Sequence, residues 1–243
     1  MKENKYDDDA FFEKYAAMKR SKEGLTGAGE WETLEGMLPD FTGKRVLDLG
    51  CGYGWHCIYA AEHGAVSVTG VDISEKMLET AVRNTSCPRV RYVRQAIEDA
   101  DFPPESFDAV ISSLAFHYIA SFGDIAQKVS GWLTPGGHFI YSVEHPVFTA
   151  QGSPQWHYVK DGRIMHFPVD NYFYEGKRVA DFLGEEVLKY HRTLTSYLTG
   201  LLSNGFEILS VVEPRPAEHM MSLPGMKDEL RRPMMLIVSA VKK

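Results

Sequence analysis

The spacing of apolar residues along the chain changes repeatedly between a pattern typical of strands and a pattern typical of helices. This predicts a chain in which strands alternate with helices. Short apolar runs bounded by glycine or polar residues are typical of buried strands, and they occur at Arg45–Leu49, Ser67–Val71, Val90–Gln95, Phe107–Ser112, His138–Val143, Phe206–Glu213 and Met234–Val241. Segments with helical spacing occur at Trp55–His63, Glu75–Asn84, within Ile119–Leu133, and at Thr193–Ser203. This order predicts an α/β fold, in which right-handed crossovers build a doubly wound parallel sheet with helices on both faces.

Two stretches depart from this alternation. Residues 1–41 show helical spacing, with a short second helix expected from about Gly29 to Leu38. Residues 144–190 are rich in aromatic side chains and contain Asp161-Gly162, which favours a hairpin turn. We therefore expect one domain over residues 1–243, with an N-terminal helical segment and an insertion of short strands and loops after the fifth strand.

Composition narrows the class of protein. The chain has 243 residues and a formal net charge of -7, so it has no general attraction to phosphate backbones, and nucleic acid is a disfavoured partner. Its three cysteines form neither a disulfide framework nor a metal-binding pair, and no acidic cluster indicates a metal site. The first ten residues are charged and polar, and no apolar run is long enough for a membrane span, which predicts a cytoplasmic protein.

The segment Val46–Gly54, VLDLGCGYG, lies between a predicted strand and a predicted helix. Glycines there let the backbone turn sharply and approach a ligand, while the helix N-terminus offers free N–H groups. Trp55 occupies the place of the last small residue of the dinucleotide fingerprint, which counts against a nicotinamide cofactor. Asp72 ends the second strand at the separation expected for a carboxylate that holds ribose hydroxyls; a helix N-terminal acid is the alternative.

Four motifs in order, VLDLGCGYG, VTGVDIS, FDAVISSLAFHYI and LTPGGHFIYSVEHP, resemble the class I S-adenosylmethionine-dependent methyltransferases. The similarity is closest to the small-molecule group typified by ubiquinone and menaquinone methyltransferases. It is strong over about Gly43 to Val143 and weaker over the last helix and strands. It implies a Rossmann-like seven-stranded sheet, in which Met234–Val241 supplies one antiparallel strand in the edge region. It also implies S-adenosylmethionine as methyl donor and S-adenosylhomocysteine as product.

The resemblance assigns roles to individual positions. Those that match the family's cofactor-binding motifs are Asp48, Gly50, Cys51, Gly52, Asp72, Ile73, Ala96, Ile97, Glu98, Ser112 and Leu114. It implies that the glycine loop holds the methionine part, that Asp72 binds the ribose, and that residues after the third strand contact adenine. The N-terminal segment forms a lid in related enzymes, with Tyr15 and Arg20 at the methionine carboxylate. The alternative is a helix packed on the sheet, with Arg20 solvated.

Methyl transfer to a weakly acidic acceptor also needs a general base, which should come from the carboxyl ends of the strands. Glu144 and His145 follow the fifth strand, and we expect His145 to face the transferred methyl group; a turn residue that anchors the insertion is the alternative. His117 is expected to pack under the pocket, and His191 is a weaker candidate. The aromatic insertion would then be a substrate-side cap, unless its aromatics only form a small core or a dimer contact.

These observations predict an enzyme that transfers a methyl group to an oxygen, nitrogen or carbon atom of a small-molecule acceptor. A non-catalytic module that binds S-adenosylmethionine is the first alternative. An NAD-dependent oxidoreductase is the second, which Trp55 disfavours.

Overall fold

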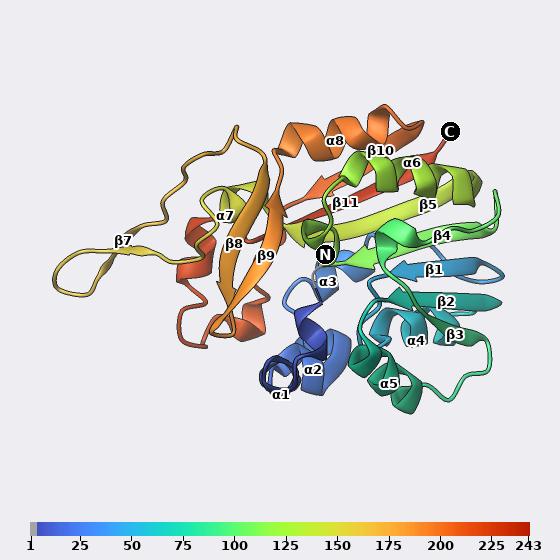
Figure 1. Cartoon of the computed structure of the whole chain (residues 1–243), viewed down its shortest axis with the longest axis horizontal. Coiled ribbons are helices and arrows are strands. Elements are labelled where there is room, and N and C mark those ends of the chain that lie inside the picture. Colours follow the sequence, from blue (N-terminus) through green and yellow to red (C-terminus); the bar gives the residue numbers. More distant parts are fainter. Residues whose placement is uncertain (1–3) are drawn as a thin grey trace.

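The seven predicted strands form one sheet in the computed structural model, which describes residues 4–243. The sheet contains β1 (Arg45–Leu49), β2 (Ser67–Asp72), β3 (Val90–Arg94), β4 (Phe107–Ser113), β5 (Leu133–Glu144), β10 (Phe206–Val212) and β11 (Met235–Lys242). Their order is β10-β11-β5-β4-β1-β2-β3 (Figure 1). β11 runs antiparallel to both of its neighbours and lies one position in from the edge, while the pairs from β5 to β3 are parallel. The predicted fold class is therefore confirmed.

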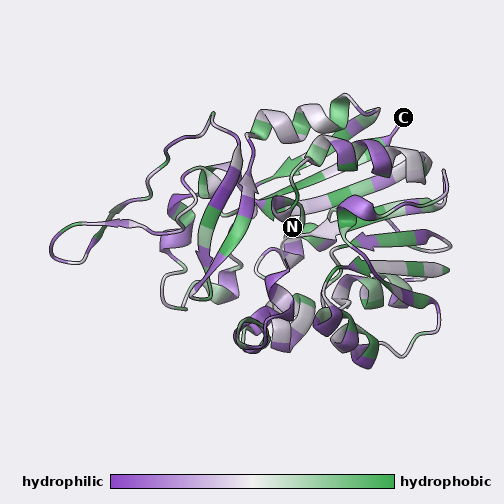
Figure 2. Ribbon diagram, in the orientation of Figure 1, coloured by the Kyte–Doolittle hydropathy of each residue, from purple (hydrophilic) through white to green (hydrophobic). Residues whose placement is uncertain are grey.

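Helices cover both faces of this sheet, as predicted. They are α3 (Trp31–Glu35), α4 (Trp55–Glu62), α5 (Glu75–Asn84), α6 (Phe122–Trp132) and α8 (Leu194–Leu202). Two further helices, α1 (Asp9–Ala16) and α2 (Lys19–Glu23), belong to the N-terminal segment. Alternation along β1 shows how the faces are divided, because Leu47 and Leu49 pack with the side chains of α6 and α8, whereas Val46 packs with those of α4 and α5. Figure 2 shows hydrophobic residues concentrated in the strands of the sheet, while the helices carry both kinds.

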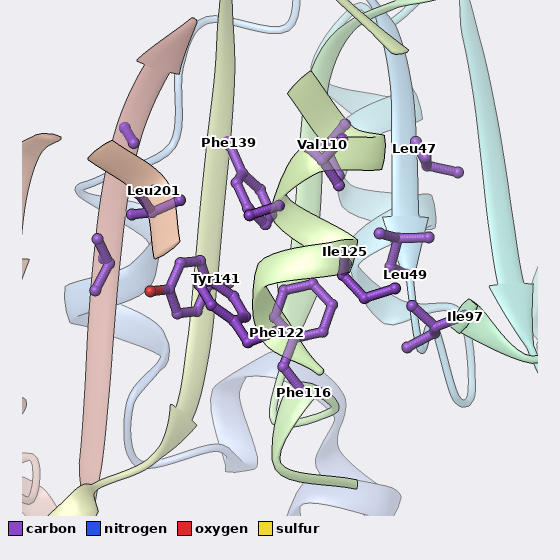
Figure 3. Close-up of a cluster of buried hydrophobic side chains, with 14 of the residues drawn as sticks. Leu47, Leu49, Ile97, Val110, Phe116, Phe122, Ile125, Phe139, Tyr141 and Leu201 are labelled. Atoms are coloured by element: carbon purple, nitrogen blue, oxygen red, sulfur yellow. The ribbon is translucent and has the colours of Figure 1, made fainter. Parts of the chain in front are cut away.

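The larger core lies between the sheet and the layer of α6 and α8, and aromatic rings fill it (Figure 3). Phe122 lies 5.1 Å from Tyr141 and 5.7 Å from Phe116 between ring centroids, and all three side chains are fully buried. Tilted and edge-on ring pairs of this kind contribute about 0.5–1.5 kcal/mol each beyond the area they bury. This core fixes the segment after β4, Phe116–Tyr118, against β5.

The insertion after β5 has its own regular structure. It contains α7 (Pro146–Thr149), a hairpin of β6 (His157–Tyr158) and β7 (Ile164–His166), and a hairpin of β8 (Gly176–Phe182) and β9 (Glu185–His191). The β6–β7 hairpin projects from the body of the molecule (Figure 1), and Asp161-Gly162 turns it as predicted, with Gly162 at φ +83°.

Two arginines, Arg231 and Arg232, join this insertion to the segment between β10 and β11. The Arg232 guanidinium lies 4.6–4.9 Å from the ring centroids of Phe148, Trp156 and Phe167, and it pairs with Glu229. That segment contains two short 3-10 turns at Glu218–Met220 and Asp228–Arg231. Some of the aromatic residues of the insertion thus form a small core of their own around one cation.

Several boundaries differ from the prediction. The helix expected from Gly29 to Leu38 is shortened to α3, and β5 begins at Leu133 rather than His138 because Leu133 pairs with Phe107.

The N-terminal segment is tied to the sheet through Asp7, whose carboxylate accepts a hydrogen bond from Ser74 Oγ at 2.5 Å. Within the described residues, no helix is long and apolar enough to cross a membrane.

Candidate functional site

A cavity of about 430 Å³ opens at the carboxyl ends of β1, β2, β4 and β5, between the N-terminal segment and the insertion. This is the edge at which ligands bind in open α/β sheets, and the volume is typical of a small-molecule site. The predicted residues that line it are Gly50, Gly52, Asp72, Ile73, Ala96, Ile97, Glu98, Leu114, Tyr15, Arg20 and Glu144. Side chains of residues 1–3 lie outside the described part of the chain.

The glycine loop after β1 is shaped by backbone angles that favour glycine. Gly50, Gly52 and Gly54 have φ values of +77°, +51° and +78°. A Cβ atom on Gly50 would lie 2.4 Å from Ala115 Cβ, and one on Gly54 would lie 2.1 Å from Tyr92 Oη, so both positions exclude a side chain. A Cβ on Gly52 would meet nothing within 4 Å. Since Gly52 lines the cavity, its backbone leaves a space there that a ligand can fill.

Asp72 is held rigidly beside this loop. Its Oδ2 accepts a hydrogen bond from Gly52 N at 2.9 Å, and its Oδ1 accepts one from Ser74 N at 2.9 Å. Burial raises the pKa of Asp72, although both backbone hydrogen bonds favour the charged form. Each carboxylate oxygen keeps a second acceptor site, so Asp72 can receive a vicinal pair of hydroxyl groups in a fixed geometry.

Three predicted residues, Asp48, Cys51 and Ser112, lie beneath the cavity rather than on its surface. Asp48 Oδ2 accepts a hydrogen bond from Cys57 Sγ at 3.3 Å, and burial raises the pKa of Asp48 to about 7. Ser112 Oγ donates to Leu49 O at 2.7 Å, and the next residue along, Ser113, lines the cavity instead. These three side chains support the loop from below.

The N-terminal segment closes one side of the cavity. Arg20 and Tyr15 both line it, and Arg20 Nη2 donates to the buried carboxylate of Glu30 at 3.0 Å. The Arg20 side chain is only 23% exposed, so the solvated alternative for this residue is wrong. Tyr6 lines the cavity as well, with its hydroxyl 3.1 Å from that of Tyr118.

A buried ion pair lies at the other end of the cavity. Glu144, at the end of β5, accepts a hydrogen bond through Oε1 from Lys189 Nζ at 2.6 Å. Lys189 belongs to β9 and is only 4% exposed, yet it lines the cavity. Its ammonium lies 5.1 Å from the ring centroid of Phe182 and 5.8 Å from that of Tyr118. The Lys189 ammonium is thus held between a carboxylate and two aromatic rings.

The prediction that His145 faces the cavity is wrong. His145 lies outside the cavity lining, its Nδ1 accepts a hydrogen bond from Val147 N at 3.0 Å, and its Nε2 lies 2.9 Å from Glu213 Oε1. The cause is local, because Pro146 begins α7 and turns the ring toward the free N–H groups of that helix. His145 is thus the turn residue that anchors the insertion, which was the alternative.

Among the cavity residues that sequence reasoning missed, two carry titratable groups at the acceptor end. His117, expected to pack under the pocket, lines it; burial lowers its pKa to about 4, and its Nδ1 accepts from Glu144 N at 3.4 Å. Lys189 was not considered, although strand alternation places it on the same face as Val187 and His191. His191 itself lies outside the lining and joins Thr149 Oγ1 to Tyr172 O, at 2.8 and 2.9 Å.

Comparisons with known proteins agree with this geometry. The family described as "Methyltransferase domain" matches residues 46–137. A crystal structure from Listeria monocytogenes, assigned to the S-adenosylmethionine-dependent methyltransferases, is 58% identical over 90% of this chain and 99% of that chain, with a TM-score of 0.87. A second such structure, from Mesorhizobium loti, is 42% identical over 90% of this chain and 100% of that chain, with a TM-score of 0.84.

The names of some relatives state an acceptor, and one of these relatives is similar over part of the chain. A fatty-acid O-methyltransferase from Mycolicibacterium smegmatis is 30% identical over 118 residues, which is 48% of this chain and 42% of that protein. The similarity thus spans less than half of either chain.

Proposed function

This chain belongs to the class I S-adenosylmethionine-dependent methyltransferases, and we propose that its cavity holds the cofactor at the glycine loop and a small-molecule acceptor at the insertion. S-adenosylmethionine supplies a methyl group on a positively charged sulfur. The residues of the chain bind and orient the two molecules and exclude water, which are the main requirements for an in-line displacement.

The residues present fit this cofactor. Gly52 leaves open space where a side chain would otherwise stand, and Asp72 presents two fixed oxygens to a ribose diol. Ile73 and Ile97 offer apolar contact to the adenine ring, beside Ala96 and Glu98. Arg20 supplies a positive charge for the methionine carboxylate, next to Tyr15. We assign Gly50 and Leu114 to the methionine part, with Asp48, Cys51 and Ser112 as their support.

A single observation carries the proposal: one continuous cavity joins the glycine loop and Asp72 to the pair of Glu144 and Lys189. The N-terminal segment 1–41 would be a lid and the insertion 144–190 a substrate-side cap, and Phe11 of the first contacts Phe182 of the second at 5.8 Å between centroids. Such an enclosed space suits a small molecule rather than nucleic acid. Since the fatty-acid methyltransferase matches less than half of the chain, its acceptor does not carry over by similarity alone.

The test is a calorimetric titration of S-adenosylhomocysteine into the wild type and into Asp72→Ala. We expect affinity to fall about ten- to a hundred-fold, because a charged hydrogen-bond partner typically contributes about 1.5–3 kcal/mol. Asp40→Ala is the matched control, since the Asp40 carboxylate also accepts a backbone N–H, from Thr42 at 2.9 Å, but lies outside the cavity. Equal affinity in a folded Asp72→Ala protein would contradict the ribose assignment. Methyl transfer from labelled S-adenosylmethionine then separates an enzyme from a non-catalytic binding module.

A further inference from the structure

The acceptor end of the cavity has hydrogen-bond donors without partners. The Lys189 ammonium has three N–H groups, and within residues 4–243 its only hydrogen bond is to Glu144 Oε1. The side chain is buried and lines the cavity, so the remaining N–H groups are available to a ligand there and not to bulk water. A buried ammonium with unused donors favours an anionic oxygen as its partner.

His117 adds a further donor. Its Nδ1 accepts the hydrogen bond from Glu144 N, so the neutral ring carries its proton on Nε2. Burial lowers the pKa of His117 to about 4, which keeps the ring neutral at physiological pH. In this tautomer Nε2 donates a hydrogen bond and cannot accept a proton.

Among residues 4–243, this end of the cavity offers no histidine that could act as a general base. His145 caps α7 through Nδ1, and both nitrogens of His191 are engaged by Thr149 and Tyr172. Three other charged side chains face this end, and each has a partner. Glu144 pairs with Lys189, and Asp181 accepts a hydrogen bond from Gly184 N. Arg178 donates hydrogen bonds to backbone carbonyl groups. Of the phenols, burial raises the pKa of Tyr6 well above its ordinary value, so Tyr6 stays protonated. An alcohol or a protonated amine would have to lose a proton before or during methyl transfer, whereas a carboxylate is already ionised at neutral pH.

We propose that the acceptor is a carboxylic acid, bound as its carboxylate by Lys189 and His117 and methylated on a carboxylate oxygen. This inference rests on the proposed methyltransferase function and names the substrate class for the same cavity. The O–CH₃ bond forms as the S–CH₃ bond breaks, and the electron pair of the broken bond stays on sulfur. The anionic carboxylate becomes a neutral methyl ester, the sulfonium becomes a neutral thioether, and no proton is released.

The experiment uses four probes with the same alkyl chain: octanoate, octanamide, octanol and octylamine. Each is titrated calorimetrically into protein saturated with S-adenosylhomocysteine, and methyl products formed from S-adenosylmethionine are identified by mass spectrometry. We expect octanoate to bind at least about tenfold more tightly than octanamide, and methyl octanoate to be the product. Its kcat/KM should stay flat between about pH 6 and pH 9, because the carboxylate is ionised throughout.

Two variants test the role of Lys189. Lys189→Met should weaken octanoate binding about ten- to a hundred-fold while leaving octanamide affinity little changed. Because this change leaves Glu144 buried and unpaired, the double variant Lys189→Met with Glu144→Gln is measured as well, and it should show the same loss. Lys14→Met is the matched control, since Lys14 pairs with Glu185 at 3.0 Å outside the cavity, and it should bind octanoate like the wild type.

The outcomes separate the two levels of the proposal. If the wild type fails to bind S-adenosylhomocysteine, the proposed function itself fails. If it binds S-adenosylhomocysteine normally, any of three results overturns the carboxylate inference alone: no binding of octanoate, preferred methylation of octanol or octylamine, or unchanged octanoate affinity in the Lys189→Met variants.

Discussion

The two ends of the cavity are built in different ways. At the cofactor end, the loop Gly50–Gly54 and Asp72 follow neighbouring parallel strands, and backbone groups carry most of the geometry. At the acceptor end, side chains from three separate segments converge, those of Phe116–Tyr118, Glu144 and Lys189. Substitutions at the cofactor end should therefore change the backbone and the stability of the fold. Substitutions at the acceptor end should instead change which acceptor the cavity binds.

The glycine loop provides the largest expected effect, and two of its glycines can be set against each other. Gly54→Ala places a Cβ 2.1 Å from Tyr92 Oη and 3.1 Å from Ala81 Cβ, at φ +78°. We expect it to lower the free energy of unfolding by about 2–4 kcal/mol, through overpacking and backbone strain. Gly52→Ala meets no neighbour within 4 Å and should cost only about 1 kcal/mol of strain.

Affinity for the cofactor product should rank the two variants in the opposite order, with Gly52→Ala the more affected. The Cβ of Gly52→Ala occupies space in the cavity, so affinity for S-adenosylhomocysteine should fall about a hundredfold or more, equal to roughly 3 kcal/mol. Urea unfolding measures the first effect and calorimetry the second. If both variants lose stability and affinity in the same proportion, the distinction between a packed and an open glycine is mistaken.

Asp48 supplies a pH dependence of intermediate size. Burial raises the pKa of Asp48 to about 7 in the folded protein, so the folded state binds this proton more tightly than the unfolded chain. Its contribution to the free energy of unfolding is therefore most favourable at acid pH and is lost as pH rises toward 7, by at most about 4 kcal/mol. Asp48→Asn cannot titrate, so the ligand-free variant should lack this decline when urea unfolding is compared at about pH 5 and pH 8.

Asp108 is a control of opposite sign for this experiment. Hydrogen bonds from Arg45 lower the pKa of Asp108, so its stabilising contribution is present above its ordinary pKa and is lost as pH falls. Asp108→Asn should therefore lower stability near neutral pH and have less effect in acid. The same pH profile in Asp48→Asn and the wild type would show that Asp48 is not the buried acid described above.

Substitution of His145 should give the smallest effect, and it tests whether this residue takes part at the acceptor end of the cavity. Because His145 lies outside the cavity lining and caps the four-residue helix α7, His145→Ala should cost about 1 kcal/mol in thermal unfolding. The rate of methyl transfer should stay within about twofold of the wild type, whereas loss of a general base would lower it by about 10²–10⁴-fold. Glu213→Gln, which alters the other partner of this ring, is the companion control.

The fold and the cofactor end could be predicted because their signals are local in the sequence. The periods that distinguish strands from helices can be recognised over a few residues. The glycine loop follows β1 and Asp72 ends β2, and these two strands are paired in parallel, so both groups reach the same edge of the sheet. The acceptor end could not be predicted in this way. His145 follows β5 directly, but Pro146 turns it away from the cavity. Lys189 reaches Glu144 only because the β8–β9 hairpin lies beside the carboxyl ends of β4 and β5 (Figure 1).

The place of β11 has a consequence for the order in which the protein folds during synthesis. β11 pairs with β5 from Met235, opposite Glu144, to Val241, opposite His138, and it separates β5 from β10. A nascent chain that has emerged only as far as β10 can already form β1 to β4 and the turn around Asp72, because domains grow from their N-terminal part on the ribosome. Until the last strand emerges, the apolar edge of β5 stays open to other strands. The strand that covers this edge is thus the last part of the sheet to be synthesised, and a chain that stops short of it exposes an edge that favours aggregation.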